Sequence, residues 1–348
     1  MRENEAARYV RALTLELSQR RGYLDGADVT TVYFGGGTPS RLIPEQIGAV
    51  LQAIRTEYGL DSLMELTVEC NPDDISLQYV SALHDLGVNR ISMGVQSFDD
   101  DMLRFLGRRH SSAQAVRAVS LCHEAGIGNV SIDLMYGLPG QTADMQLRDL
   151  ETAAGLQVSH ISSYCLSYEE GSPLERLRAS GRITPQSDDV CAAMFDRMND
   201  RLRNAGFEHY EISNFCRPGY HSRHNSSYWD GTPYLGVGAG AHSYDGRSRQ
   251  WNPSDLDSYM SGVEQGAPIC EIERLSAKDR FNEMVMLRLR TAQGLDLKKL
   301  SARDSDRLIQ SSRPLIGSGS LQLDGDRLFI PESRMFISDS IISSLFRD

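Results

Sequence analysis

The regular alternation of strand-like and helix-like segments over the first two thirds of the chain is the feature that most restricts its fold. Runs rich in apolar and β-branched residues, each followed by a segment with helical spacing, occur at residues 29–34, 65–69, 90–95, 130–135 and 160–165. They recur at intervals of about 25 to 40 residues, which is the length of a unit that joins two parallel strands through a helix. Because the strands carry apolar residues on both faces, we expect a parallel sheet or barrel covered by helices.

Glycine and polar residues gather where each of these strands ends. The first strand runs into "GGGTP", the second into Glu69 and "CNP", the third into "GVQSF" and the fourth into "DLMYGLPGQT". A single glycine or proline at such a point is equally well explained by a tight turn. Ligands of parallel α/β proteins bind at the carboxyl ends of strands, so the coincidence of these segments predicts one shared site.

The composition is that of a soluble globular protein with no strong affinity for nucleic acid. The chain has 348 residues and a net charge of −11, which disfavours nucleic acids and anionic membranes as partners. No apolar run reaches the length of about 18 residues that a membrane span needs, so we expect membrane contact to be transient at most. The six cysteines are scattered without short spacings, which predicts reduced thiols and a cytoplasmic location.

The pattern changes near Ser276, and we expect two domains, residues 1–275 and 276–348. The second holds helical stretches, a hairpin "LQLDGDRLFI" with Asp324-Gly325 in its turn, and a last helix near "SDSIISSLF". Helices followed by a small β wing are typical of a winged helix. Residues 278–348 contain twelve Lys and Arg against ten Asp and Glu, so we interpret this domain as a packing appendage rather than a DNA-binding module.

The three consecutive glycines Gly35, Gly36 and Gly37 predict close contact between the backbone and a ligand. Without Cβ atoms they expose N–H and C=O groups at the strand end. The stretch lacks the Lys-Ser/Thr of a P-loop and the spacing of a dinucleotide fingerprint. A zwitterionic ligand, whose ammonium group needs backbone carbonyls, fits these residues better than a phosphate.

A series of motifs extends through almost the whole chain. In order, they are "TTVYFGGGTPSRL", "LTVECNPDDI", "GVNRISMGVQSFDDDMLRFLGRRH", "NVSIDLMYGLPGQT", "HYEISNFCRPGYHSRHNSSYW" and "YLGVGAGAHSY". In order and spacing they resemble the HemN/HemW branch of the radical S-adenosylmethionine (SAM) proteins. That branch contains oxygen-independent coproporphyrinogen III dehydrogenases and haem chaperones. The resemblance implies an α/β fold, a partial (β/α)6 TIM-like barrel that opens on SAM and here lacks its first strand.

The resemblance also assigns roles to residues at the strand ends. Arg108 in "LGRRH" would pair with the methionyl carboxylate, although a salt bridge to the run Asp99–Asp101 is an equal alternative. Asp133 lies in an apolar strand, where an unpartnered carboxylate is costly, so a nearby ligand or cation is favoured. The residues that would hold the methionyl ammonium, or line the pocket around the ammonium and ribose, are Gly36, Gly37, Thr38, Glu69, Gln96 and Asp133.

One motif of the family is absent from this sequence. Relatives begin with a strand that runs into Cys-x3-Cys-x2-Cys, whose thiolates hold a [4Fe–4S] cluster and leave one iron open to SAM. The closest cysteines here, Cys191 and Cys216, are 25 residues apart. Two explanations are open: about 20 to 40 residues precede Met1 in the full-length protein, which we favour because the SAM residues are intact, or the lineage has lost the cluster. We therefore expect the chain as given to be inactive in reductive SAM cleavage, and the cluster only in a full-length form.

The segment "HNSSYW" followed by "GVGAGAHSY" is more similar to the chaperones than to the dehydrogenases. That similarity makes His224 a candidate haem ligand, with His221 and His242 as lesser candidates, and Tyr228 and Trp229 as a flat surface for the macrocycle. A hydrogen-bonded structural role is the alternative for His224.

Three functions remain open at the level of sequence. The favoured one is a haem chaperone with haem or porphyrin and a haem-acceptor protein as partners. The others are a coproporphyrinogen III dehydrogenase and a SAM-binding scaffold without activity. An unpaired edge at residues 29–34 would also offer a surface for a homodimer.

Overall fold

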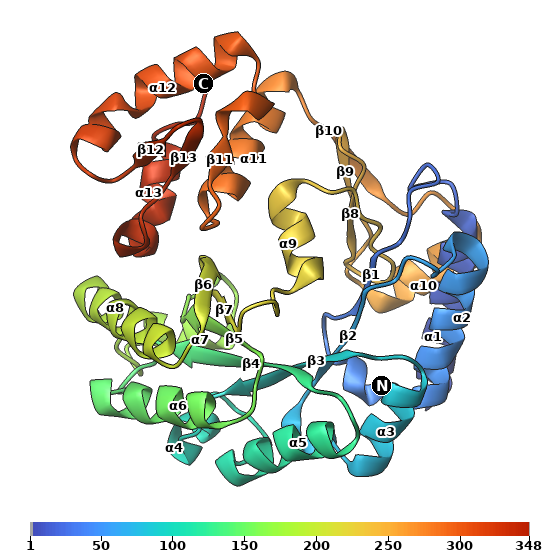
Figure 1. Cartoon of the computed structure of the whole chain (residues 1–348). Coiled ribbons are helices and arrows are strands. Elements are labelled where there is room, and N and C mark those ends of the chain that lie inside the picture. Colours follow the sequence, from blue (N-terminus) through green and yellow to red (C-terminus); the bar gives the residue numbers. More distant parts are fainter. Residues whose placement is uncertain (1–2, 348) are drawn as a thin grey trace.

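A seven-stranded curled sheet forms the centre of the protein, in a computed structural model that describes residues 3–347 (Figure 1). The strand order is β1-β2-β3-β4-β5-β7-β6, and β1 to β5 pair in parallel. The strands are β1 (Thr31–Phe34), β2 (Glu65–Cys70), β3 (Arg90–Gln96), β4 (Asn129–Tyr136), β5 (His160–Cys165), β6 (Glu208–Glu211) and β7 (Asn214–Cys216). The five parallel strands confirm the predicted ones to within two residues at each end.

The far edge of the sheet departs from a simple series of parallel strands. The tight hairpin β6–β7 folds back so that β7 pairs antiparallel with both β5 and β6. It follows that β6 runs in the same direction as β1 to β5, with β7 inserted between them. The partial barrel expected from the resemblance is therefore present, but its last parallel strand is separated from the others by one reversed strand.

The outer face of the sheet is covered by helices that return the chain from one parallel strand to the next (Figure 1). Their start signals are local: the Ser111 hydroxyl accepts the Gln114 backbone N–H, and the Gln114 side chain accepts the Ser111 N–H. Such a capping box contributes about 1 kcal/mol to helix stability. The helices between the strands are α2 (Pro44–Tyr58), α3 (Leu77–Asp85), α4 (Asp100–Phe105), α5 (Ser112–Glu124), α6 (Ala143–Gly155), α7 (Pro173–Ala179) and α8 (Asp188–Asn204). Helix α1 (Glu3–Gln19) precedes β1 and packs against α2.

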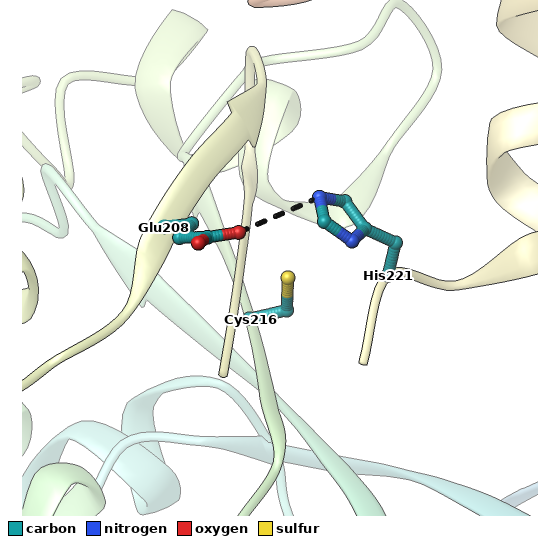
Figure 2. Close-up of side chains that lie close together, drawn as sticks. All are labelled: Glu208, Cys216 and His221. Atoms are coloured by element: carbon teal, nitrogen blue, oxygen red, sulfur yellow. Dashed lines mark ion pairs between the residues drawn. The ribbon is translucent and has the colours of Figure 1, made fainter. Parts of the chain in front are cut away.

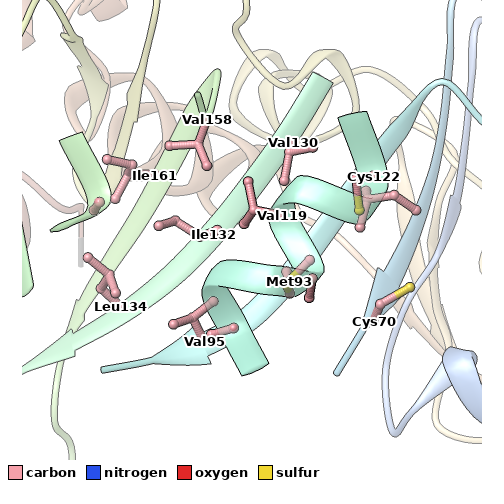
Figure 3. Packing of buried hydrophobic residues seen from close by; sticks show 14 of the residues in the cluster. Cys70, Met93, Val95, Val119, Cys122, Val130, Ile132, Leu134, Val158 and Ile161 are labelled. Atoms are coloured by element: carbon pink, nitrogen blue, oxygen red, sulfur yellow. The ribbon is translucent and has the colours of Figure 1, made fainter. Parts of the chain in front are cut away.

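The main core lies between the sheet and these helices. Alternate strand residues such as Ile91 and Ile132 belong to one apolar cluster with Val119 and Cys122 of α5, and Figure 3 shows Ile132 on the face of the sheet that this helix covers. Both isoleucines are completely buried, and burying one side chain of this size contributes about 1.5–3 kcal/mol. The outward face explains the apolar residues that the sequence places in every strand.

The concave face of the same strands is polar. Thr67, Ser131, His160 and Arg90 are all buried on it, and helix α9 (Arg223–Asp230) lies inside the curve (Figure 1). Because side chains alternate along a strand, the same strands supply this polar row and the apolar core with alternate residues. The polar row supplies the candidate site described below.

Two further layers complete the fold. Beside β1 lie a three-stranded sheet and a helix: β8 (His242–Tyr244), β9 (Ser248–Trp251), β10 (Glu271–Arg274) and α10 (Leu256–Glu264). The C-terminal segment has its own apolar cluster, which includes Phe281, Leu308 and Leu328. Its elements are α11 (Ala277–Leu289), β11 (Leu295–Asp296), α12 (Ala302–Gly317), β12 (Gln322–Asp324), β13 (Arg327–Phe329) and α13 (Ser338–Ser343). The hairpin β12–β13 is the predicted wing, with Gly325 left-handed in its turn.

None of the helices formed by residues 3–347 combines the length and the apolar character that a membrane crossing would require.

Candidate functional site

The glycine loop after β1 is open on its ligand side. Gly36 and Gly37 have φ angles of +76° and +56°, and a Cβ at either position would meet no atom within 4 Å. Gly35 differs, because its Cβ would lie 2.4 Å from the Tyr33 ring. The loop therefore needs glycine for its conformation at Gly36 and Gly37, and presents bare backbone to an adjacent space.

Glu69 at the end of β2 fixes this loop. Its Oε2 accepts the Gly36 backbone N–H at 3.0 Å, and its Oε1 accepts the Tyr33 hydroxyl at 2.7 Å. Burial, with the Glu69 charge beside it, raises the pKa of the Tyr33 phenol far above its usual value. Tyr33 is therefore a permanent donor that holds the carboxylate in place, a role that sequence reasoning missed.

Asp133 on β4 faces the same concave space. It is the register partner of Ser162 on β5, which donates a hydrogen bond to its carboxylate. Desolvation raises the pKa of Asp133 to about 6, with a further contribution from the Glu69 charge. The carboxylate is half-buried and lacks a cation in direct contact among the described residues. A cationic ligand would offset the desolvation cost of ionising this carboxylate.

Arg108 and Gln96 close the other side of the space. The Arg108 Nη2 donates to Asn71 Oδ1 and to the Gly94 carbonyl, both at 2.7 Å. The alternative partner, the run Asp99–Asp101, makes other contacts: Asp99 caps α4 and Asp101 pairs with Arg104. Gln96 has a φ of +72°, an unfavourable conformation for a residue other than glycine, which is typical of ligand-contacting positions.

The residues present fit SAM. An open glycine cradle, two carboxylates and a half-buried guanidinium lie at the same end of the sheet, and these groups suit an amino-acid ligand with ammonium and carboxylate groups. That these residues bind SAM stays a prediction. When bound, SAM would supply an adenosyl group, while Glu69 and Asp133 would bind its cationic side and Arg108 its carboxylate.

A cavity of about 1260 Å³ adjoins the glycine loop and extends along β1. Gly36, Gly37 and Thr38 line one end, and apolar side chains of α1 and α2, among them Leu13 and Val50, line another part. Among the described residues β1 pairs only with β2, so the cavity follows its free edge.

His224 stands in the cavity wall, on helix α9. Its Nδ1 lies 2.9 Å from Thr31 Oγ1, its Nε2 lies 2.9 Å from the Tyr228 hydroxyl, and its ring stacks on Tyr33 with centroids 4.8 Å apart. Burial lowers the pKa of His224 to about 4, so the imidazole is neutral at ordinary pH. His224 is therefore in direct contact with Tyr33, the residue that holds Glu69.

Helix α9 is anchored by Glu65 at the start of β2, another residue that sequence reasoning missed. The Glu65 carboxylate accepts the backbone N–H groups of Arg223 and His224 at 2.9 and 3.0 Å. It is 4 % exposed, and it meets the positive end of the helix dipole. A buried carboxylate within a strand was visible in the sequence, but its partner lies 158 residues away.

The lesser candidates are placed apart from His224. His242 lines the cavity and stacks on Trp251, with ring centroids 6.1 Å apart. His221 lies next to Glu208 and contacts the Tyr210 ring edge-on. Tyr228 borders the cavity, whereas its neighbour Trp229 does not.

Comparison with known proteins places the chain among relatives. A profile of the radical SAM superfamily matches residues 7–153, and one of the HemN C-terminal domain matches residues 275–336. Over 340 residues the chain is 35 % identical to the "Heme chaperone HemW" of Mycobacterium tuberculosis (strain H37Rv), covering 97 % of this chain and 86 % of that protein. The chain belongs to the HemW family of radical SAM proteins.

Other HemW proteins and a solved structure agree with this assignment. The "Heme chaperone HemW" of Lactococcus lactis is 39 % identical over 269 residues, covering 77 % of this chain and 71 % of that protein. The coproporphyrinogen III oxidase HemN of Escherichia coli, described as a radical SAM enzyme, superposes with a TM-score of 0.84. At 22 % identity, over 99 % of this chain and 84 % of that one, this likeness shows the same fold.

Membership of the radical SAM superfamily implies SAM and a [4Fe–4S] cluster as cofactors. The SAM residues fit, as described above. The cysteines do not fit the cluster: within residues 3–347 the one close group of three or more His, Cys, Asp and Glu side chains contains a single cysteine.

Proposed function

We propose that this HemW-family chain is a haem chaperone with His224 as the haem ligand, next to a SAM site at the strand ends. The observation that carries the proposal is the position of His224, a neutral imidazole on helix α9 that stacks on Tyr33, the residue that holds Glu69. Neutral imidazole is the form that ligates haem iron.

His224 would ligate the iron through Nε2. Because Nδ1 is engaged with Thr31 Oγ1, the ring keeps its orientation when Nε2 exchanges the Tyr228 hydroxyl for the metal. A second partner that orients a ligating histidine in this way is usual in metal sites. Tyr228 would then be free to border the macrocycle.

Contact between the two sites supports a coupled function. Tyr33 donates to Glu69 and stacks on His224, so a shift of Glu69 on SAM binding would move the ring against which His224 packs. We propose that SAM alters haem affinity by this route. Haem or porphyrin is the ligand class, an acceptor protein would receive the haem, and we place the activity in the cytoplasm.

Titration of haem into the purified protein tests the proposal. We expect a defined Soret band at one haem per chain, and a loss of at least about tenfold in affinity in His224→Ala. The matched control is His84→Ala, an exposed histidine on the outer helix α3, which should titrate like the wild type.

Two results would contradict the chaperone proposal. One is tight SAM binding without any haem binding. The other is turnover of coproporphyrinogen III under anaerobic conditions by this chain, which would favour the dehydrogenase.

A further inference from the structure

Three metal-ligating side chains meet at the end of the sheet opposite the SAM site. Glu208 of β6 and Cys216 of β7 are register partners across the hairpin, and His221 lies in the loop that follows β7 (Figure 2). Cys216 also pairs with His160, the first residue of β5, which places the group at the amino-terminal ends of the parallel strands.

A turn encoded by the sequence brings His221 back to Cys216. In "CRPGYH" the Tyr220 N–H donates to the Arg217 carbonyl at 3.0 Å, and Gly219 has a φ of +85°. Proline followed by a left-handed glycine is the signature of a type II turn. Cys216 and His221 flank this turn, so their side chains face the same point by local geometry, and strand pairing adds Glu208.

The three ligand atoms have nearly the spacing of a metal site. They lie within 4.8 Å of one another, and the distance between His221 Nε2 and Glu208 Oε2 is 3.9 Å. Around a tetrahedral zinc ion, with bonds of about 2.0–2.3 Å, neighbouring ligand atoms are separated by about 3.3–3.8 Å. Small rotamer shifts of the exposed Glu208 side chain would close the difference.

We propose that Glu208, Cys216 and His221 form a binding site for one zinc-class divalent cation, with a fourth position open to water. A thiolate, an imidazole and a carboxylate form a borderline-soft donor set that suits zinc better than calcium or magnesium. One thiolate and one carboxylate balance the charge of a divalent ion. On binding, the sulfur–metal bond replaces the S–H bond of Cys216, and the proton passes to water.

The surroundings of Cys216 favour the thiolate only when a cation is present. Desolvation, followed by the charge of Glu208, raises the pKa of the Cys216 thiol to about 12, while the Tyr220 N–H and the Arg90 charge lower it. Arg90 is 1 % exposed, and its Nε and Nη1 have no hydrogen-bond partner. Thiolate ligands are commonly supported by such donors, and metal coordination supplies the remaining stabilisation.

The site has an entry path and a mechanical consequence. The side chains of His221 and Glu208 are 36 % and 53 % exposed, so an ion reaches them from solvent. His221 directly precedes Ser222, whose hydroxyl caps α9 by accepting the Asn225 N–H. Bound metal would therefore tie the hairpin β6–β7 to the start of the helix that carries His224.

The test uses the whole haem-free chain and the metal alone. After chelator treatment and dialysis, Zn²⁺ is titrated against a chromophoric competitor, and Co²⁺ is added as a spectroscopic probe. We expect one ion per chain and a thiolate-to-cobalt charge-transfer band, both lost in Cys216→Ser. Glu208→Gln, at an exposed position, should fold normally and bind at least about tenfold more weakly.

Matched controls separate the site from other thiols and carboxylates. Cys270→Ser and Glu273→Gln, on residues outside the group, should bind Zn²⁺ and Co²⁺ like the wild type. Absence of stoichiometric zinc binding by the wild type would overturn the proposal, and so would an unchanged cobalt band in Cys216→Ser. Neither outcome depends on haem binding at His224.

Discussion

The two ends of the central sheet are built from the same strands and have opposite characters. At the carboxyl ends, Gly36 faces open space, and Asp133 forms no ion pair with any of the described residues. At the amino ends, the Glu65 carboxylate caps α9 and both ring nitrogens of His160 are bonded, to Ser131 and to Tyr210, although Nε and Nη1 of Arg90 have no hydrogen-bond partner. Around Glu65 and His160 the protein therefore satisfies its own buried polar groups, whereas the carboxyl ends need a ligand.

The difference follows from what covers each end. Helix α9 places its N-terminus over Glu65, so a buried carboxylate there meets donors that belong to the chain. Within residues 3–347 the hydrogen-bond donor to Asp133 is Ser162 of β5 rather than a helix N-terminus. A buried ionised group with partners is compatible with a stable fold. Burial shifts the pKa of a group without partners towards its neutral form, and a ligand of opposite charge would stabilise the ionised form. The predictions below test this contrast.

The largest effect is expected for Glu65→Ala. The substitution leaves two backbone N–H groups of α9 unsatisfied in a buried place, which should lower the free energy of unfolding by about 3 kcal/mol. Urea denaturation followed by circular dichroism measures it. The exposed Glu151→Ala on α6 is the control and should stay within about 0.5 kcal/mol of the wild type. A loss below about 1 kcal/mol for Glu65→Ala would mean that the amino end is not closed by this contact.

Asp133→Asn should raise the free energy of unfolding, which is the opposite of the effect of Glu65→Ala. The folded pKa of about 6 lies above the usual value of 3.8, so the native state holds the extra proton and stability falls as pH rises between these values. Removing the charge should therefore stabilise the ligand-free protein by about 2 kcal/mol at pH 7.5 and by nothing below about pH 4. Urea unfolding at pH 4, 5.5 and 7.5 measures the difference. Destabilisation at pH 7.5 would show that a cation inside the protein already compensates Asp133.

SAM affinity should also depend on the charge of the Asp133 carboxylate. Because the ionised carboxylate would attract the cationic ligand, Asp133→Asn should weaken SAM binding by about tenfold at pH 7.5, and wild-type affinity should fall as pH drops through about 6. Isothermal titration calorimetry across this range measures both. A wild-type affinity that is independent of pH would separate Asp133 from the ligand.

Gly36→Ala tests the cradle with a smaller effect. A Cβ has room there, but the φ of +76° makes any side chain unfavourable by about 1 kcal/mol. Chemical denaturation should show that loss, together with weaker SAM binding. Gly128→Ala, where a Cβ also meets nothing within 4 Å and φ is not left-handed, is the control and should be neutral.

Tyr228→Phe should produce the smallest effect of the series, an increase in haem affinity. Without the hydroxyl, the His224 Nε2 loses its hydrogen bond and is free to ligate iron, so haem affinity should rise about threefold, the equivalent of a modest hydrogen bond. Soret titration measures it against Tyr220→Phe, an exposed residue away from the cavity. Weaker haem binding in Tyr228→Phe would mean that the hydroxyl itself contacts the ligand.

Much of the fold could be read from the chain because its signals are local. Apolar alternation located β1 to β5 to within two residues, and "LDGD" located the wing hairpin. The insertion of β7 between β5 and β6 could not be read, because it depends on pairing between distant strands. The residues of the SAM candidate site were identified by motif, and their shared space follows from the common direction of the parallel strands.

By itself, the sequence determined which residues lie at the strand ends, because spacing and glycine conformations act over a few residues. The tertiary structure alone decided their partners: Glu65 with α9, and Tyr33 with both Glu69 and His224. The physical reason is distance along the chain. Thr31 and His224, which share a hydrogen bond, are 193 residues apart in the sequence, and only the curvature of the sheet around α9 brings these two residues together.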